Sequence, residues 1–136
     1  MAQLRRQAAV IPYRIRKARL EVALVTTSTG KGWIVPKGSI DEGERARDAA
    51  IREAEEEAGL RGIVTRKRLG RYRHVNGHGP CQVDVYIMRV TTVLDEWMED
   101  KRRRRRWMRV PDAAARVREE LQEFVHGLQS SLERQR

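Results

Sequence analysis

The sequence predicts an α/β fold, and three observations support this prediction. Short runs rich in branched aliphatic residues recur along the chain up to residue 110, which is typical of strands. One long segment without glycine or proline, 44–58, interrupts them and has the composition of a helix. The last part of the chain carries apolar residues at helical spacing. With 136 residues the chain is predicted to form a single domain, 1–136.

The first predicted elements are two strands, 8–13 and 20–27. The basic turn that joins them, 14–19, indicates a hairpin. A turn-rich loop follows, and a short apolar run, 33–35, ends at Pro36.

The segment 44–58 is the first predicted long helix. Gly59 follows it where a C-terminal cap belongs, because glycine readily adopts the left-handed conformation that ends many helices. Alanine recurs at every fourth position and forms a stripe of small side chains: Ala46, Ala50, Ala54 and Ala58.

Two further strands are predicted at 63–72 and 82–93. The second has apolar residues on both faces, as an interior strand does. A strand at 107–110 follows the basic run 101–106, and Asp112 is the predicted N-cap of a final helix that continues to the end of the chain. The apolar residues expected to pack this helix on the sheet are Val117, Leu121, Phe124, Leu128 and Leu132.

The net charge of +10 favours polyanionic partners, which include nucleic acid, an anionic membrane or a phosphate-dense small molecule. The single cysteine, Cys81, suits a reducing compartment, argues against a structural zinc cluster and is predicted to be a small buried residue. Charges interrupt every apolar run near the N-terminus, and no run is long enough to span a membrane. The expected location is the cytoplasm.

Three glutamates of the predicted helix, Glu53, Glu56 and Glu57, form one cluster because residues three and four apart share a face. Glutamates on a solvated helix face are the simpler interpretation. However, Glu53 and Glu57 align with the alanine stripe that should face the protein body, whereas Arg52 and Glu55 are expected to point the other way, as is Asp48. Buried acids need a compensating partner, and a hard divalent cation such as magnesium fits carboxylates beside a loop.

The segment 38–60, GSIDEGERARDAAIREAEEEAGL, resembles the Nudix box GX5EX7REUXEEXGU, in which U is a bulky aliphatic residue. Leu60 fits the last aliphatic position, and Ala54 is smaller than usual at the first. The resemblance implies a Nudix-type α/β/α sandwich, with a mixed β-sheet between helices and the box as a loop, helix, loop unit. All seven fixed residues of the box are present: Gly38, Glu44, Arg52, Glu53, Glu56, Glu57 and Gly59.

The resemblance also implies roles for these residues. Glu53, Glu57, Glu56 and Gly38 are the expected metal site, with Mg²⁺ as the cofactor and Mn²⁺ as the alternative. The expected catalytic residues are Glu56, which activates water, and Arg52, whose ion pair orients the acids. Glu44 would support the site through a further metal contact. Because the base lies outside the box in some members, the alternatives for it are Asp95, Glu96 and Glu99.

The flanking segments resemble the diphosphoinositol polyphosphate and diadenosine polyphosphate hydrolases. WIVPKG at 33–38, VLDEW at 93–97 and the basic run before Trp107 carry this similarity, which covers most of residues 5–110. Gln7 replaces a frequent arginine of the inositol-phosphate enzymes, and the PKG sequence favours nucleotides. Alternation along a strand would place Arg103 and Arg105 on the same side. The predicted phosphate contacts are Arg5, Arg6, Lys37, Gly38, Ser39, Arg103 and Arg105.

Several alternatives remain at this level. The basic run is equally typical of a solvated or nonspecific nucleic-acid patch. His74 and His78 are interpreted as surface histidines, and Trp33 and Trp97 as either base-stacking or core residues. Beyond a highly phosphorylated small molecule, RNA is a candidate partner, whereas neither a membrane nor an obligate protein partner is indicated. The resemblance implies metal-dependent hydrolysis of a phosphoanhydride bond, in dinucleoside polyphosphates or diphosphoinositol polyphosphates, by attack of water on phosphorus. The competing functions are an RNA 5′-pyrophosphohydrolase, a nucleoside triphosphate pyrophosphatase and a non-catalytic basic nucleic-acid-binding module.

Overall fold

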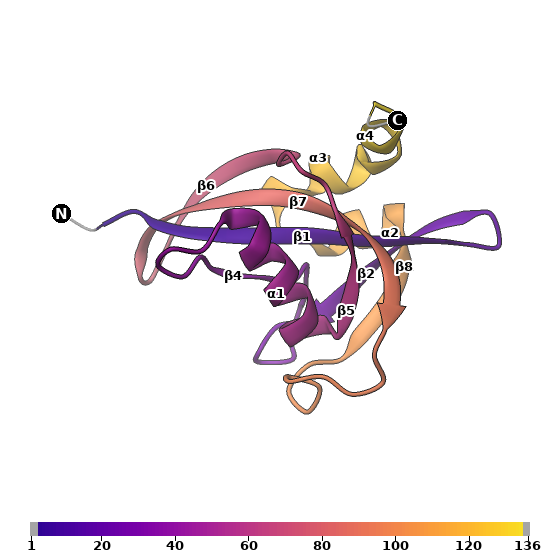
Figure 1. Cartoon of the computed structure of the whole chain (residues 1–136), viewed down its shortest axis with the longest axis horizontal. Coiled ribbons are helices and arrows are strands. Elements are labelled where there is room, and N and C mark those ends of the chain that lie inside the picture. The colour runs from indigo at the N-terminus through magenta and orange to yellow at the C-terminus, as the bar shows by residue number, and fades with distance from the viewer. Residues whose placement is uncertain (1–2, 135–136) are drawn as a thin grey trace.

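The computed structural model describes residues 3–134, in which eight strands form one sheet with helices on both faces (Figure 1). The strands are β1 Arg5–Arg16, β2 Arg19–Thr26, β3 Trp33–Ile34, β4 Lys37–Ser39, β5 Leu60–Val64, β6 Gly70–Asn76, β7 Gly79–Val93 and β8 Arg105–Arg109. The helices are α1 Ala46–Ala58, α2 Val110–Arg116, α3 Glu119–His126 and α4 Leu128–Arg134.

The sheet is mixed because β1 runs parallel to β7 while the other pairs are antiparallel. The predicted hairpin is confirmed, and β1 and β2 extend so far that only Lys17 and Ala18 remain in the turn. Both have positive φ, 52° and 63°, as a two-residue turn between twisted strands requires. The interior position predicted for residues 82–93 is also confirmed, since β7 lies between β1 and the edge strands β5 and β6.

Each face of the sheet has its own core. On one face the alanines of α1 pack against β1, β2 and β7, and the absence of larger side chains lets the helix approach closely. On the other face α2, α3 and α4 cover Ile11, Leu24, Val83 and other apolar residues. Cys81 is fully buried in this second core, as predicted. The α/β/α sandwich is therefore confirmed.

The prediction of one strand at 63–72 is wrong. The chain instead forms β5 and β6, which pair end to end along the same edge of β7, and residues 65–69 turn outward between them. β7 is long enough, at 15 residues, to pair with both strands. The outward turn leaves Arg66, Lys67 and Arg68 exposed.

The prediction of one final helix is also wrong, since the segment forms three short helices that turn at Val117 and Gly127. Asp112 lies in the first turn of α2 rather than at its N-cap, which is Arg109. The turns keep the apolar side chains on the sheet, and Leu121 and Leu128 are buried. Among residues 3–134, no helix has both the length and the apolar character that crossing a bilayer requires.

Candidate active site

Helix α1 carries the predicted carboxylates on its inward side. The helix ends at Gly59, whose left-handed conformation (φ 64°) lets its N–H bond the carbonyls of Ala54 and Glu55. Glu53 and Glu57 lie on the alanine stripe and are only 8% and 5% exposed, as the stripe predicted. Two acids are therefore buried side by side, where desolvation is costly unless a cation is present.

Arg52 holds the acids together instead of pointing away from them, which corrects the prediction from the helical period. Its Nη1 donates to Glu53 Oε1 at 2.8 Å and to Glu56 Oε2 at 3.3 Å. Its Nε and Nη2 reach the two carboxylate oxygens of Glu44, both at 3.0 Å, and Nη2 also bonds the Ser39 carbonyl. The long side chain curls back along the helix, so Arg52 joins α1 to the loop before it.

A second arginine, Arg103, pairs with Glu57. Arg103 Nη2 lies 3.0 Å from Glu57 Oε2, and the arginine side chain is only 12% exposed. Its Nη1 donates to the Thr26 carbonyl, and the Lys37 N–H donates to Glu57 Oε1 at 2.7 Å. Arg103, predicted as a phosphate contact, is thus already engaged with a carboxylate.

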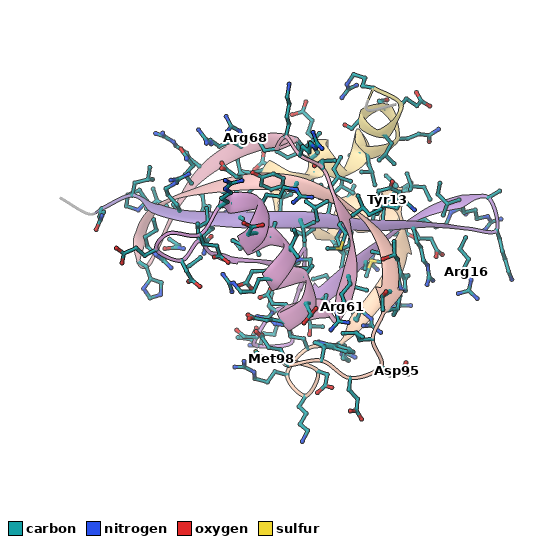
Figure 2. All side chains as sticks on the ribbon, in the orientation of Figure 1. Tyr13, Arg16, Arg61, Arg68, Asp95 and Met98 are labelled. Atoms are coloured by element: carbon teal, nitrogen blue, oxygen red, sulfur yellow. The ribbon has the colours of Figure 1, made fainter. Side chains whose placement is uncertain are left out.

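A further carboxylate comes from the loop between β7 and β8. Glu99 Oε1 accepts from Arg103 Nε at 2.7 Å, and the Glu99 N–H bonds the Glu56 carbonyl. The other two candidate bases of this loop, Asp95 and Glu96, are exposed, and no ion pair among the described residues joins them to α1 (Figure 2). Of the three alternatives, only Glu99 reaches the cluster.

Burial changes the acidity of the inward carboxylates. Desolvation raises the pKa of Glu57 to about 7, although Arg103 and the Lys37 N–H pull it down. Desolvation also raises the pKa of Glu53, against the effect of Arg52, and the charge of Glu99 adds to both increases. Both acids would gain from a nearby metal cation, which favours their ionised form.

Gly38 provides the space that Glu53 needs. A Cβ at this position would overlap the Glu53 carboxyl group, so only glycine lets the main chain of β4 lie against that acid. The close approach places the Gly38 main chain beside a carboxylate, as expected for a residue of the metal site.

The donor set fits a hard divalent cation, because Glu53, Glu56 and Glu57 supply only carboxylate oxygens from one helix face. In residues 3–134, no three His, Cys, Asp or Glu side chains already surround a common metal position. Arg52 and Arg103 contact carboxylate oxygens from both sides of the cluster. A cation would replace these contacts in part.

Arg105 and Trp97 have structural roles at the C-terminal end of α1. Arg105 Nη1 donates to the carbonyls of Ala58, Gly59 and Leu94, and its guanidinium lies 4.3 Å from the centre of the Trp97 ring. The indole N–H of Trp97 donates to the Glu57 carbonyl. Arg103 precedes β8 and Arg105 is its first residue, and both side chains contact α1. Arg105 caps the helix, and its role as a phosphate contact stays a prediction.

The remaining predicted contacts divide between the two faces of the sheet. In the pairing of β4 with β1, Gly38 lies opposite Ala8 of the α1 core, whereas Lys37 lies opposite Ala9 of the other core. Ser39 pairs with Gln7, whose side chain accepts a hydrogen bond from Cys81 on that second face. Arg5 and Arg6 alternate in the same way, so Arg5 lies on the second face and Arg6 on the α1 face.

Strand register assembles a second group of polar residues on the face opposite α1. Arg5, Cys81 and His74 occupy one row across β1, β7 and β6, and Gln7, Val83 and Tyr72 occupy the next. Lys37 joins them from β4 and Arg118 from the start of α3, with its guanidinium 5.8 Å from the centre of the Tyr72 ring. The β6 cluster is the group Arg5, Lys37, Tyr72, His74 and Arg118.

Three polar atoms of the β6 cluster are buried without a hydrogen-bond partner among residues 3–134: Arg5 Nη1, Tyr72 Oη and His74 Nε2. Such atoms are rare in folded proteins, and each calls for an explanation. Burial lowers the pKa of Lys37 and of His74, and the charge of Arg118 lowers both further. Burial also raises the pKa of Tyr72 to about 12. Glu120 is an acid beside this group and is paired with Arg118 through two hydrogen bonds. The cluster therefore has unpaired polar atoms, and its cations outnumber this acid.

Tyr72 and Arg118 were not identified from the sequence, and His74 is half-buried rather than a surface residue like the exposed His78. The alternation of Tyr72 and His74 along a strand is a sequence signal that both side chains share a face. Arg118 has no such signal, because it reaches the cluster only through the packing of α3. Trp33 and Trp97, the two candidate stacking residues, are half-buried.

Comparison with known proteins agrees with this geometry. A model of the NUDIX domain matches residues 4–128. The chain is 33% identical to Nudix hydrolase 12, mitochondrial, of Arabidopsis thaliana, over 85% of this chain and 70% of the relative. It is 35% identical to diphosphoinositol polyphosphate phosphohydrolase 3-beta of Bos taurus, over 80% of this chain and 66% of the relative.

A crystal structure of a C. elegans Ap4A hydrolase in a binary complex has the same fold, with a TM-score of 0.83 at 22% identity, over 95% of this chain and 98% of that one. The alignments with three curated plant relatives span 59% to 70% of their length. Nudix hydrolases generally use divalent metals, which agrees with the carboxylate donor set. On the intact box, the sandwich around it and these matches, the chain belongs to the Nudix hydrolase family.

Proposed function

We propose that this protein hydrolyses a phosphoanhydride bond in dinucleoside polyphosphates, by attack of water on phosphorus. The observation that carries the proposal is the carboxylate cluster of α1, in which two acids are buried against the main chain of the glycine-containing strand β4. An ordinary surface helix does not bury several acids together. A site that receives a metal and a phosphate does.

Magnesium is the cation we propose, held by Glu53, Glu57 and Glu56 with the Gly38 carbonyl. When bound, it would neutralise phosphate charge and lower the pKa of a coordinated water. Manganese has similar ligand preferences and is the alternative.

Glu56 is our proposed general base. Its side chain is 29% exposed, so it is open to solvent, unlike Glu53 and Glu57. Arg52 acts as a positioning residue, because it fixes Glu56, Glu53 and Glu44 relative to one another. Glu99 accepts a hydrogen bond from Arg103 and thereby orients the arginine that pairs with Glu57.

Strand β4 links this site to the β6 cluster. The Lys37 N–H bonds the Glu57 carboxylate, while the Lys37 side chain lies on the opposite face near Arg118 and His74. A substrate whose scissile phosphate lies at α1 would extend around β4 and place its far part on the β6 cluster. The unpaired polar atoms of Tyr72, His74 and Arg5 would then acquire partners.

The composition of the β6 cluster favours a nucleotide as this far part. The Tyr72 and His74 rings stack with centroids 5.9 Å apart, and Arg118 lies over Tyr72, which suits a flat base beside phosphate. Diphosphoinositol polyphosphates are the second candidate, since curated relatives at 34–35% identity carry that activity in their names. They would require more cations than the cluster provides, and Gln7 lies at its edge.

The test is hydrolysis of a panel with magnesium or with EDTA, in which products are identified by mass. The panel contains diadenosine polyphosphates, diphosphoinositol polyphosphates, nucleoside triphosphates and 5′-triphosphate RNA. We expect magnesium-dependent release of a nucleotide, with the highest kcat/KM on diadenosine polyphosphates. Hydrolysis in oxygen-18 water then locates the attacked phosphorus.

Three results would contradict the proposal in different ways. A preference for diphosphoinositol polyphosphates would replace the substrate and keep the site. Rates on RNA that grow with chain length and fall steeply with salt would favour the RNA function, because longer RNA makes more phosphate contacts. Tight nucleic-acid binding without turnover of any substrate would indicate a non-catalytic module.

A further inference from the structure

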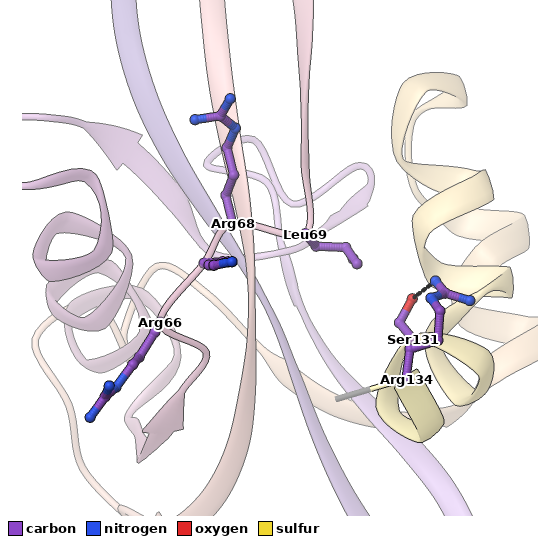
Figure 3. A pocket seen from close by; sticks show the side chains of 6 residues that line it. Arg66, Arg68, Leu69, Ser131 and Arg134 are labelled. Atoms are coloured by element: carbon purple, nitrogen blue, oxygen red, sulfur yellow. Dashed lines mark hydrogen bonds between the residues drawn. The ribbon is translucent and has the colours of Figure 1, made fainter. Parts of the chain in front are cut away.

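Another group of cations lies apart from the active site. Figure 3 shows a hollow of about 580 Å³ between the β5–β6 loop and α4. Four of its six lining residues are cationic and none is acidic. The lining residues are Arg66, Lys67, Arg68, Leu69, Ser131 and Arg134.

The loop that provides three of these cations is held firmly by the protein. The N–H of Thr65 bonds the Ile87 carbonyl at 3.0 Å, and that of Leu69 bonds the Val85 carbonyl at 2.7 Å. Arg47 of α1 donates to the carbonyls of Val64 and Thr65. Both ends of the loop are therefore fixed to β7, and the main chain that carries the three consecutive cations has a defined position before any ligand binds.

Helix α4 forms the opposite wall. Ser131 is only 4% exposed, and its Oγ accepts a hydrogen bond from Arg134 Nη2 at 3.1 Å, the dashed line of Figure 3. A serine hydroxyl that accepts one hydrogen bond can also donate one. The hollow thus has cations from two elements that are distant in sequence on its rim, where Arg66 and Arg68 extend outward from the loop (Figure 3), and one buried hydroxyl in its wall.

The cations of the hollow have no acidic partners within residues 3–134, since no ion pair there includes Arg66, Lys67, Arg68 or Arg134. The adjacent strands differ in this respect. Arg61 of β5 pairs with Glu55, and Arg71 of β6 pairs with Asp84. A group of cations in one hollow without counterions is stabilised by an anion, and guanidinium groups bind phosphate oxygens in pairs.

We propose that this hollow binds a polyphosphorylated small molecule at a site separate from hydrolysis. Its volume falls in the range of small-molecule pockets, and its two walls suit a compact ligand better than an extended nucleic-acid strand. The hollow is formed with α4, which packs on the face of the sheet opposite α1 and its carboxylates. A compact anion in the hollow therefore does not reach the carboxylates.

The probe is inorganic tripolyphosphate, titrated into the full-length protein in EDTA at constant ionic strength. EDTA makes binding independent of metal and of turnover. Tripolyphosphate binding can therefore be absent while the proposed hydrolase activity is present, and it can be present while that activity is absent. Calorimetry gives the affinity, and amide NMR shifts give the location. We expect shift changes at Leu69 and Ser131.

Variants separate this hollow from general surface charge. We expect Arg66→Ala with Arg68→Ala to weaken tripolyphosphate binding at least tenfold, and Arg134→Ala alone to weaken it about threefold from the other wall. The matched control is Arg16→Ala with Arg19→Ala, which removes the same charge from the hairpin at another end of the molecule (Figure 2) and should change affinity less than twofold. The rate of phosphoanhydride hydrolysis should be unchanged in the two hollow variants and in the control.

Equal weakening in the control, or shift changes that avoid Leu69 and Ser131, would overturn the proposal. A third arm uses single-stranded RNA of increasing length. Binding that tightens with length and that tripolyphosphate does not displace would replace the small molecule with nucleic acid and overturn it as well.

Discussion

The two faces of the sheet differ in how they treat charge. On the α1 face the acids are buried, and Arg52, Arg103 and the Lys37 N–H contact three of the four carboxylate oxygens of Glu53 and Glu57. On the opposite face the β6 cluster buries polar atoms that have no partner among the described residues, and positive charge is in excess. Both arrangements cost stability, and each would be relieved by a different part of one ligand.

The difference indicates what each face contributes. An acid cluster whose oxygens are held in fixed positions by Arg52 and Arg103 is preorganised for a cation. The unpaired polar atoms of the other face have no hydrogen-bond partner among residues 3–134, so they lower the stability of the fold until a substrate binds. The first face should therefore determine the rate, and the second the affinity.

The largest expected effect is on the rate. Replacing Glu56 or Glu57 by glutamine removes a charge without changing shape, and we expect kcat on the preferred polyphosphate to fall about 10²- to 10⁴-fold. The control is Glu55→Gln on the same helix, because Glu55 is exposed and pairs only with Arg61. Full activity in both test variants would show that the site assignment is wrong.

The next effect is on stability and depends on pH. The pKa of Glu57 is raised to about 7 in the folded protein, mainly by burial, so the folded state keeps a proton that the unfolded chain loses near pH 4.5. In EDTA this group's contribution to the free energy of unfolding is full below pH 4.5 and is lost as pH rises to about 7. The loss is on the order of 2 to 3 kcal/mol.

Denaturant unfolding at pH 5 and pH 7.5 measures this loss, and Glu57→Gln should flatten the difference between the two. Added magnesium should restore stability mainly at the higher pH, where the carboxylate is ionised. If the free energy of unfolding changed equally with pH in the wild-type protein and in Glu57→Gln, the assignment of the buried proton to Glu57 would be contradicted.

The smallest expected effect concerns Tyr72, and it has opposite signs for stability and function. Tyr72→Phe removes a buried hydroxyl without a partner, so we expect the free energy of unfolding to rise by up to about 1 kcal/mol. The same change should raise KM about fivefold with little change in kcat, because the substrate loses a hydrogen bond. The control is Tyr13→Phe, farther along the sheet (Figure 2).

Unchanged KM in Tyr72→Phe would remove the β6 cluster from the substrate site and leave the carboxylate site intact. An equal rise in KM in Tyr13→Phe would show that the hydroxyl acts through the fold. Either result would end the division of roles between the two faces.

The sequence alone determined the parts that depend on short-range spacing. The period of the helix placed Glu53 and Glu57 on the alanine stripe, and Gly59 marked the helix end, because both follow from local geometry. The box identified the acids of the site, and the apolar pattern identified β7 as an interior strand. These features need no knowledge of distant contacts.

Only the tertiary structure decided which arginines bind the protein itself and which donors remain free. Arg103 and Arg105 look alike in the basic run, yet one holds Glu57 and the other caps α1. Arg118 and Tyr72 meet although they are far apart in sequence, because strand register and the packing of α3 bring them together. A charge in a sequence has no partner until the chain folds, and its partner determines whether it supports the fold or awaits a ligand.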